Sequence, residues 1–263
     1  IIMKKFMLFV VMASVVLTSC VNEDKEVMES ASKKAISFDM PVMKPTRLEL
    51  GEIIGTTYPE GEKFKVYCKS YTGAYTDWTA GADYFHPAGE TVALTAGNWS
   101  TTTVHYWPEL GNNLVFAAYS PATASAHGTF AQTQTGLTIT GFSTQAAVAN
   151  QYDLMYTPRV IDLDKNSAGT PVPLVFKHAL TSVVFKATKT DADATYTIKS
   201  LTVNGLVSTT GNFNQNIPTP AGLDGTATWT PAAATDKTYE ILTGKNIDVA
   251  KTGTDLTGVG STA

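Results

Sequence analysis

Apolar side chains recur at every second residue in one short segment after another, and this period of two constrains the fold more than any other feature. Such alternation is typical of a half-buried β-strand, because successive side chains of a strand point to opposite faces. The alternating segments cover residues 36–40, 64–69, 104–107, 137–139, 174–178 and 183–187. In residues 114–119 both sets are apolar, which predicts a strand buried on both faces. Helical periodicity is nearly absent, so the sequence predicts an all-β fold, most simply built of sandwiches.

The apolar face changes phase in two places along this pattern. It shifts between Leu180 and Val183, and again between Ile198 and Leu201. An extra residue in one strand moves the following side chains to the other face, so a β-bulge at each place would restore the burial pattern. We therefore expect two bulges in the second half of the chain.

Residues 157–173 interrupt the alternation with a different composition. The segment holds Pro158, Pro171 and Pro173 together with a polar run over residues 162–167. Polar, proline-rich stretches are typical of boundaries between domains. We expect an N-terminal β-sandwich over residues 35–158 and a C-terminal sandwich over residues 159–263.

The N-terminus has the layout of a lipoprotein signal peptide. Lys4 and Lys5 precede an apolar run over residues 6–17, and Leu17-Thr18-Ser19-Cys20 closes it. The run is too short to span a bilayer, which takes about 20 apolar residues. We predict removal of residues 1–19 and attachment of lipid to the Cys20 thiol, with several acyl chains because one alone binds a membrane only marginally. The alternative is an ordinary secretory signal that happens to precede a cysteine.

Residues 20–34 are polar and cannot bury themselves, so we interpret them as a flexible tether. The acidic cluster Asn22-Glu23-Asp24-Lys25-Glu26 resembles the tag that sends lipoproteins to the outer face in Bacteroidetes-type bacteria. A plain solvated linker is the alternative interpretation. With the tag, the protein would sit at the outer membrane and cell surface.

Charge and cysteine content exclude some function classes. Without residues 1–19 the chain keeps 17 of its 19 lysines and arginines against 23 acidic residues, a net charge of −6. Such an acidic body argues against a nucleic-acid partner, which requires a basic face. With Cys20 used by lipid, Cys68 is the remaining cysteine, so an intrachain disulfide is excluded.

The sequence offers little for catalysis or cofactor binding. The four histidines are far apart, and neither a nucleophile elbow nor a phosphate-binding glycine loop is present. Cys68 shares a strand phase with Phe64 and Val66, which favours an inert buried thiol. His178 shares a phase with Leu174 and Phe176, which favours a structural histidine with one satisfied nitrogen. We predict a non-enzymatic protein without cofactor or metal.

Two weaker patterns have both a functional and a structural interpretation. Residues 162–166 begin like a calcium loop, but Ser167 stands at the glycine position and Pro173 at that of the bidentate glutamate, which favours a solvated loop. Aromatic residues are frequent between Tyr67 and Trp107, and exposed aromatic rings stack on sugars. Aromatic strands that pack a core are the favoured interpretation, and a glycan site is the alternative.

Several motifs resemble the fimbrillin-like family of surface lipoproteins. They are spread over the chain after Cys20: Val104-His105-Tyr106-Trp107-Pro108, Leu114-Val115-Phe116-Ala117-Ala118-Tyr119-Ser120-Pro121, Gln151-Tyr152-Asp153-Leu154-Met155-Tyr156, Leu174-Val175-Phe176-Lys177-His178-Ala179-Leu180 and Ser208-Thr209-Thr210-Gly211-Asn212-Phe213. The resemblance implies two transthyretin-like β-sandwiches in tandem. Further strands follow in the family, so we expect the second sandwich to be incomplete at Ala263 and the usual donor strand to be missing.

The resemblance also implies assembly into a pilus by strand exchange. Family members lose a first strand to a protease that cuts after an arginine, and a neighbour's strand fills the groove. Arg47 stands where such a cut would fall, although an ordinary surface arginine is the alternative. The leading hypothesis is a lipid-anchored fimbrial subunit or adhesin whose partners are other subunits, the outer membrane and a surface ligand. A glycan-binding lipoprotein is the runner-up, and an extracellular hydrolase comes third.

Overall fold

The regular structure of the chain is almost entirely β-strand. The computed structural model describes residues 33–39, 58, 61–73, 81–134, 136–145, 151–181, 185–191, 193–206, 210–216, 226–232, 237–249 and 254–255. Within these residues the helices η2 (Ala122–His127) and η4 (Lys165–Ser167) are short 3-10 turns. No helix in the described part is long and apolar enough to cross a membrane. The prediction of an all-β fold is confirmed.

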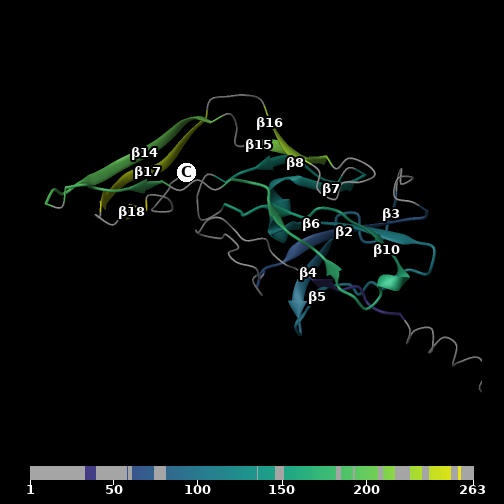
Figure 1. The fold of residues 1–263 in the computed structure, drawn as a ribbon. Helices are drawn as coiled ribbons and strands as arrows, with labels where there is room; N and C mark the ends of the chain where they lie inside the picture. The colour runs from purple at the N-terminus through teal and green to yellow at the C-terminus, as the bar shows by residue number, and fades with distance from the viewer. Residues whose placement is uncertain are drawn as a thin grey trace, which may run out of the picture.

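The largest described sheet has ten strands in the order β11-β1-β5-β4-β2-β6-β9-β12, with β3 paired to β2 and β10 to β6 (Figure 1). Its strands are β1 (Phe38–Asp39), β2 (Phe64–Tyr71), β3 (Ala82–Asp83), β4 (Glu90–Thr95), β5 (Asn98–Thr101), β6 (Asn113–Ser120), β9 (Met155–Tyr156), β10 (Val160–Leu163), β11 (Val172–Pro173) and β12 (Lys177–His178). The first strand, β1, lies between two others, parallel to β11 and antiparallel to β5. It is therefore an internal strand of this sheet.

One face of the ten-stranded sheet covers a cluster of buried side chains that we call the inner core. Its members are Ile36, Phe38, Tyr58, Phe64, Val66, Cys68, Phe85, Val92, Trp107, Leu114, Phe116, Ala118, Met155, Val172, Leu174 and Phe176. Alternate residues of β2 and β6 contribute to it, as the period of two predicts. Burying one large apolar side chain is worth about 1.5–3 kcal/mol, so this cluster is a main source of stability.

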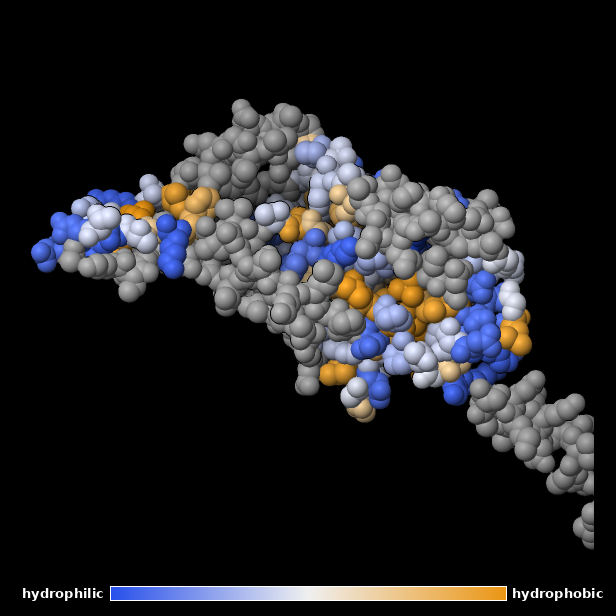
Figure 2. Space-filling view, viewed as in Figure 1, coloured by the Kyte–Doolittle hydropathy of each residue, from blue (hydrophilic) through white to orange (hydrophobic). Residues whose placement is uncertain are grey.

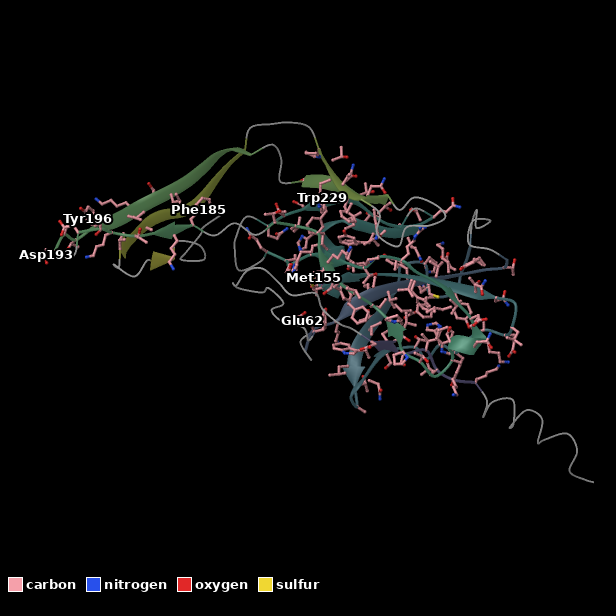
Figure 3. All side chains as sticks on the ribbon, in the orientation of Figure 1. Glu62, Met155, Phe185, Asp193, Tyr196 and Trp229 are labelled. Atoms are coloured by element: carbon pink, nitrogen blue, oxygen red, sulfur yellow. The ribbon has the colours of Figure 1, made fainter. Side chains whose placement is uncertain are left out.

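The opposite face of β2 and β6 packs against a four-stranded sheet in the order β16-β15-β8-β7 (Figure 1). Its strands are β7 (Thr129–Thr133), β8 (Gly136–Ser143), β15 (Thr210–Asn216) and β16 (Thr226–Pro231). Between the sheets lies the outer core, made of Tyr67, Tyr119, Ala124, Phe130, Leu137, Ile139, Phe142, Leu154, Tyr156 and Phe213. In Figure 3, Trp229 marks the four-stranded layer and Met155 the larger sheet. The prediction that residues 114–119 are buried on both faces is confirmed.

A buried glutamine side chain joins the two sheets. Gln215 on β15 accepts a hydrogen bond from the backbone N–H of Leu137, at 2.9 Å, and donates one to the carbonyl of Thr157, at 3.2 Å. Gly136 makes room for it, because a Cβ there would lie 2.8 Å from the Gln215 Oε1 atom, and its φ of +121° also favours glycine. This amide satisfies polar backbone groups that would otherwise be buried without partners.

A long two-stranded ribbon projects from this body (Figure 1). It pairs β14 (Thr197–Leu206) with β17 (Lys237–Asp248), and a short pair, β13 (Lys186–Ala187) with β18 (Thr254–Asp255), lies beside it. The register of β14 shifts between Ile198 and Ser200, which confirms the bulge predicted there. The other predicted bulge falls on residues 182–184, outside the described part. Figure 2 shows polar residues near the ribbon tip and hydrophobic ones gathered on the body.

Strands on either side of the predicted domain boundary pair with one another. β10, which begins just after Pro158, pairs with β6, and β15 pairs with β8. Residues from beyond the boundary thus take part in both sheets of the body. The division into residues 35–158 and 159–263 stays a prediction.

The strand predicted over residues 104–107 is wrong. These residues form a loop with one isolated bridge, from Ala35 to Tyr106. Val104 and Tyr106 are exposed, whereas Trp107 is buried. Two backbone hydrogen bonds hold this loop, one from the N–H of Ile36 to the carbonyl of His105 and one from the N–H of Trp107 to the carbonyl of Lys34. They are too few to form a strand ladder.

Candidate functional site: the groove around the first strand

Residues 33–39, the first-strand segment, are held by backbone hydrogen bonds along both edges. On one edge the N–H of Ile36 donates to the carbonyl of His105, at 2.8 Å, and the N–H of Trp107 donates to the carbonyl of Lys34, at 3.1 Å. On the other edge the N–H groups of Val172 and Leu174 donate to the carbonyls of residues 37 and 39, at 2.8 and 2.7 Å. The segment thus completes two neighbours that would otherwise present unpaired edges.

Two side chains of this segment enter the inner core. Ile36 and Phe38 are 2% and 3% exposed. The Phe38 ring makes edge-to-face contacts with Phe64 and Phe116, with centroids 6.1 and 6.0 Å apart. Each aromatic pair of this kind adds about 0.5–1.5 kcal/mol to what area burial gives. Ser37 and Asp39 point the other way and are half-buried and exposed, so only one face of the segment is apolar.

The neighbours of the first-strand segment form a slot that this extended segment fills. Its walls supply backbone donors and acceptors, and its floor takes apolar side chains at alternate positions. The prediction that Ile36 and Phe38 alternate as buried residues of a first strand is confirmed. The third predicted member, Met40, lies outside the described residues, as do Cys20 and Arg47. The predictions for those two residues therefore remain predictions.

Two residues around the slot were not predicted from the sequence. Val172 pairs with Phe38 in parallel, and its side chain is buried. Val172 stands two residues before Leu174, so it extends the alternation at 174–178. This spacing could have predicted it as a buried residue. Tyr58 is also fully buried in the inner core, where its ring contacts Phe64 and Trp99. No repeating pattern surrounds Tyr58, so nothing in the sequence indicated it.

Buried tyrosines line both cores. The Tyr58 hydroxyl lies 2.6 Å from the Ser120 Oγ atom in the inner core, and the Tyr67 hydroxyl donates to the carbonyl of Phe130, at 3.0 Å, in the outer core. Burial raises the pKa of Tyr58 and the pKa of Tyr67 well above the ordinary value. A buried phenolate would lose its hydration, so both groups stay neutral at physiological pH.

The residues considered for chemistry lie in separate places. Cys68 is buried in the inner core, as predicted, and burial raises the pKa of its thiol, which disfavours the reactive thiolate. His178 Nδ1 lies 2.7 Å from the Asp153 Oδ1 atom, while His178 Nε2 is buried without a hydrogen bond. This is the structural histidine with one satisfied nitrogen that the sequence predicts.

The 162–167 segment uses its polar groups locally. The Asp164 carboxylate accepts hydrogen bonds from the backbone and side-chain amides of Asn166, and Lys165 pairs with Glu109 at 2.6 Å. Across the described residues no three His, Cys, Asp or Glu side chains gather in a way that could hold a metal.

Most described aromatics between residues 67 and 107 are buried. Tyr67, Tyr71, Phe85 and Trp107 are buried, while Tyr106 is 44% exposed. Tyr75 and Trp78 lie outside the described residues. The interpretation of these residues as core is thus confirmed for the four that are buried, and no stacked aromatic platform for sugars is found among the described ones.

Comparisons with known proteins found one family model and several solved structures similar to this chain. A family model described as fimbrillin-like matches residues 46–258. A crystal structure of a fimbrial protein from Bacteroides vulgatus is similar at 12% identity, with a TM-score of 0.48 over 86% of this chain and 75% of that one.

A candidate cell adhesion protein from Bacteroides uniformis is similar at 18% identity, with a TM-score of 0.40 over 83% and 74%. No curated protein matches the chain. The family match carries the assignment, because it spans most of the sequence and every described strand after β1. This chain belongs to the fimbrillin-like family.

Proposed function

We propose that this protein is a fimbrial subunit or adhesin, non-enzymatic, anchored to the cell surface through lipid on Cys20 and assembled by strand exchange. The observation that carries the proposal is the position of the first-strand segment. It is an internal strand with two buried side chains, yet it comes from the start of the folded body and connects directly to the tether.

Strand exchange follows from what its removal would leave. The edges at residues 105–107 and at β11 would lose their partners, and the inner core would lose Ile36 and Phe38. Two such side chains are worth about 3–6 kcal/mol to a replacement strand. A strand supplied by another copy makes a head-to-tail contact, which does not close on itself and so builds a filament.

Arg47 is the proposed processing site. It follows Asp39 by eight residues in the sequence, and a cut there separates the first-strand segment and tether from the rest of the body. The other arginine of the chain, Arg159, is only 3% exposed, so it is protected from a protease while the protein is folded. An arginine-specific protease should therefore cut the native chain at one place.

The test is limited proteolysis of the chain with an arginine-specific protease, followed by light scattering. A version of the protein that carries a donor strand supplies the replacement strand, because a free peptide would fill the slot without linking one copy to the next. Wild type should be cut and form large assemblies, whereas Arg47→Ala and the charge-matched control Arg47→Lys should stay uncut and monomeric. Assembly of Arg47→Ala at the wild-type rate would show that the cut at Arg47 is not the switch.

The anchor is tested by labelling cells with a radioactive fatty acid. Cys20→Ala should abolish the label and leave the precursor uncleaved or released. Cys68→Ala is the matched control and should keep the label, because that thiol is buried in the folded body. Equal labelling of wild type and Cys20→Ala would reject the lipid anchor.

A further inference from the structure

One short loop carries most of the exposed apolar side chains of the described chain. In the loop between β5 and β6, Val104, Tyr106 and Leu110 are 58%, 44% and 66% exposed. Among the described residues the other large hydrophobic side chain with comparable exposure is Tyr196, which Figure 3 places on the distant ribbon. Isolated exposed hydrophobics are ordinary, whereas three within seven residues of one loop make this loop the strongest candidate for a contact surface among the described residues.

The loop is held in this exposed form by its neighbours. Trp107 is buried in the inner core, and the His105 ring packs on Phe85 with centroids 4.2 Å apart. Because these inward residues fix the backbone, the side chains on either side of them are directed outward. The tyrosine hydroxyl of Tyr84 also donates to the carbonyl of Tyr106, which ties the loop to the sheet.

The same loop borders the point where the tether enters the body. Tyr106 bridges to Ala35, and Trp107 donates to the carbonyl of Lys34. Lys33 and Lys34 are both exposed beside it. Lys33 follows Cys20 by thirteen positions, so the chain between them reaches at most about 45 Å at about 3.5 Å per residue. A flexible chain of that length averages only about 20 Å between its ends.

We propose that this surface, formed by Val104, Tyr106 and Leu110 with Lys33 and Lys34, docks on the bilayer that holds the lipid of Cys20. The inference rests on the lipid anchor proposed above. Tyrosine suits the membrane interface because one end is apolar and the other wet, and valine and leucine enter the acyl boundary. Lysines attract anionic headgroups, and the nearby negative charge of Glu109 is offset by its pair with Lys165.

Docking belongs to the uncut chain. A cut after Arg47 followed by strand exchange removes the tether, both lysines and the Ala35 bridge together. The surface then keeps its apolar side chains but loses its cationic part and its anchor. Processing would thereby release the body from the membrane as well as open its groove.

Flotation with vesicles tests the surface without any attached lipid. The mature chain with Cys20→Ser is mixed with vesicles of phosphatidylethanolamine and phosphatidylglycerol, or of phosphatidylcholine alone. We expect it to float with the vesicles, and the pair Val104→Ser and Leu110→Ser should lower the partition coefficient about tenfold. Lys33→Gln with Lys34→Gln should weaken binding to the anionic vesicles only. Tyr196→Ser is the matched control and should bind as wild type does.

Three outcomes would overturn the proposal. Absence of wild-type flotation, or equal flotation of wild type and the Val104→Ser, Leu110→Ser variant, would show that the loop does not dock on lipid. Light scattering without vesicles gives the third outcome. If wild type is a dimer and the same variant is a monomer, the surface binds a second copy of the chain. The vesicle assay uses a chain without acyl groups, so its result is independent of the fatty-acid labelling that tests Cys20.

Discussion

The inner and outer cores lie on opposite faces of β2 and β6, but they draw their side chains from different parts of the chain. The inner core includes Ile36 and Phe38, which precede Arg47 in sequence, whereas the earliest member of the outer core is Tyr67. Loss of the first-strand segment therefore removes two side chains from the inner core and none from the outer core. If one strand is exchanged for another, the inner core is disturbed, and the intact outer core can keep the remaining strands in register.

The largest expected effect comes from removing the first-strand segment. A chain that begins after Asp39 should lose about 3–6 kcal/mol in free energy of unfolding, because Ile36 and Phe38 no longer fill the inner core. A peptide of residues 33–43, added in trans, should restore most of that loss. Urea unfolding with and without the peptide measures both quantities. If the shortened chain is as stable as the full one, the inner core does not depend on this segment.

A truncation in the outer core should cost almost as much but should not be rescued. Phe213→Ala removes a ring that is 2% exposed and packs on Tyr156 and Trp229, so we expect a loss of about 3–5 kcal/mol. Asn214→Ala, on the exposed side of the same strand, is the matched control and should change stability by less than about 0.5 kcal/mol. Recovery of Phe213→Ala with the 33–43 peptide would contradict the independence of the two cores.

Alkaline pH should weaken both cores through their tyrosines. The pKa of Tyr58 and that of Tyr67 are raised by burial, so above the ordinary value of about 10 the folded state holds more protons than the unfolded state. The free energy of unfolding therefore falls as pH rises beyond about 10, by at most about 1.4 kcal/mol per pH unit for each tyrosine, and is unaffected below.

Single variants separate the two contributions. Tyr58→Phe and Tyr67→Phe should each lower this slope, measured by urea unfolding across the alkaline range. Part of the slope should remain, because burial also raises the pKa of Tyr119 and that of Tyr84. Cys68→Ala in every protein removes the thiol, whose raised pKa acts in the same direction from about pH 9. An unchanged slope in both tyrosine variants would show that these hydroxyls are not the titrating groups.

The smallest effect is expected on the outward side of the first strand. Asp39→Ala should change stability by less than about 0.5 kcal/mol, because the side chain is exposed and only its backbone joins the sheet. The same substitution in the 33–43 peptide should leave rescue unchanged. A large loss would mean that the outward face of the segment also makes contacts that matter.

The sequence predicts strands well where tertiary packing agrees with the local pattern. Residues 64–69 and 114–119 alternate as the structure requires, since β2 and β6 lie between two cores and every side chain has an assigned face. The pattern misleads at residues 104–107, where the alternating apolar residues are the exposed ones. Period alone cannot reveal this, because it reports that two faces differ but not which of them meets the core.

The sequence does not show which strands pair with one another in the sheets. The parallel contact of β1 with β11 joins residues more than a hundred positions apart, and nothing local to either segment specifies it. Asn204-Gly205 has the composition of a tight turn yet lies inside β14, because ladder pairing with β17 overrides the local preference. The slot could thus be predicted as an alternating strand, but not as an internal position between two distant partners.

The bond from Leu137 to Gln215 spans 78 residues and sets the order in which the molecule can take shape. As the chain emerges from its N-terminus, β7 and β8 are present long before β15 arrives, so β8 lacks a strand partner and the outer core lacks Phe213. Contacts of high sequence separation also slow folding, because a long loop must close before they form. The body therefore stays an incomplete, aggregation-prone intermediate until residue 215 is made, and a chaperone that shields this hairpin during that interval would raise the yield of native protein.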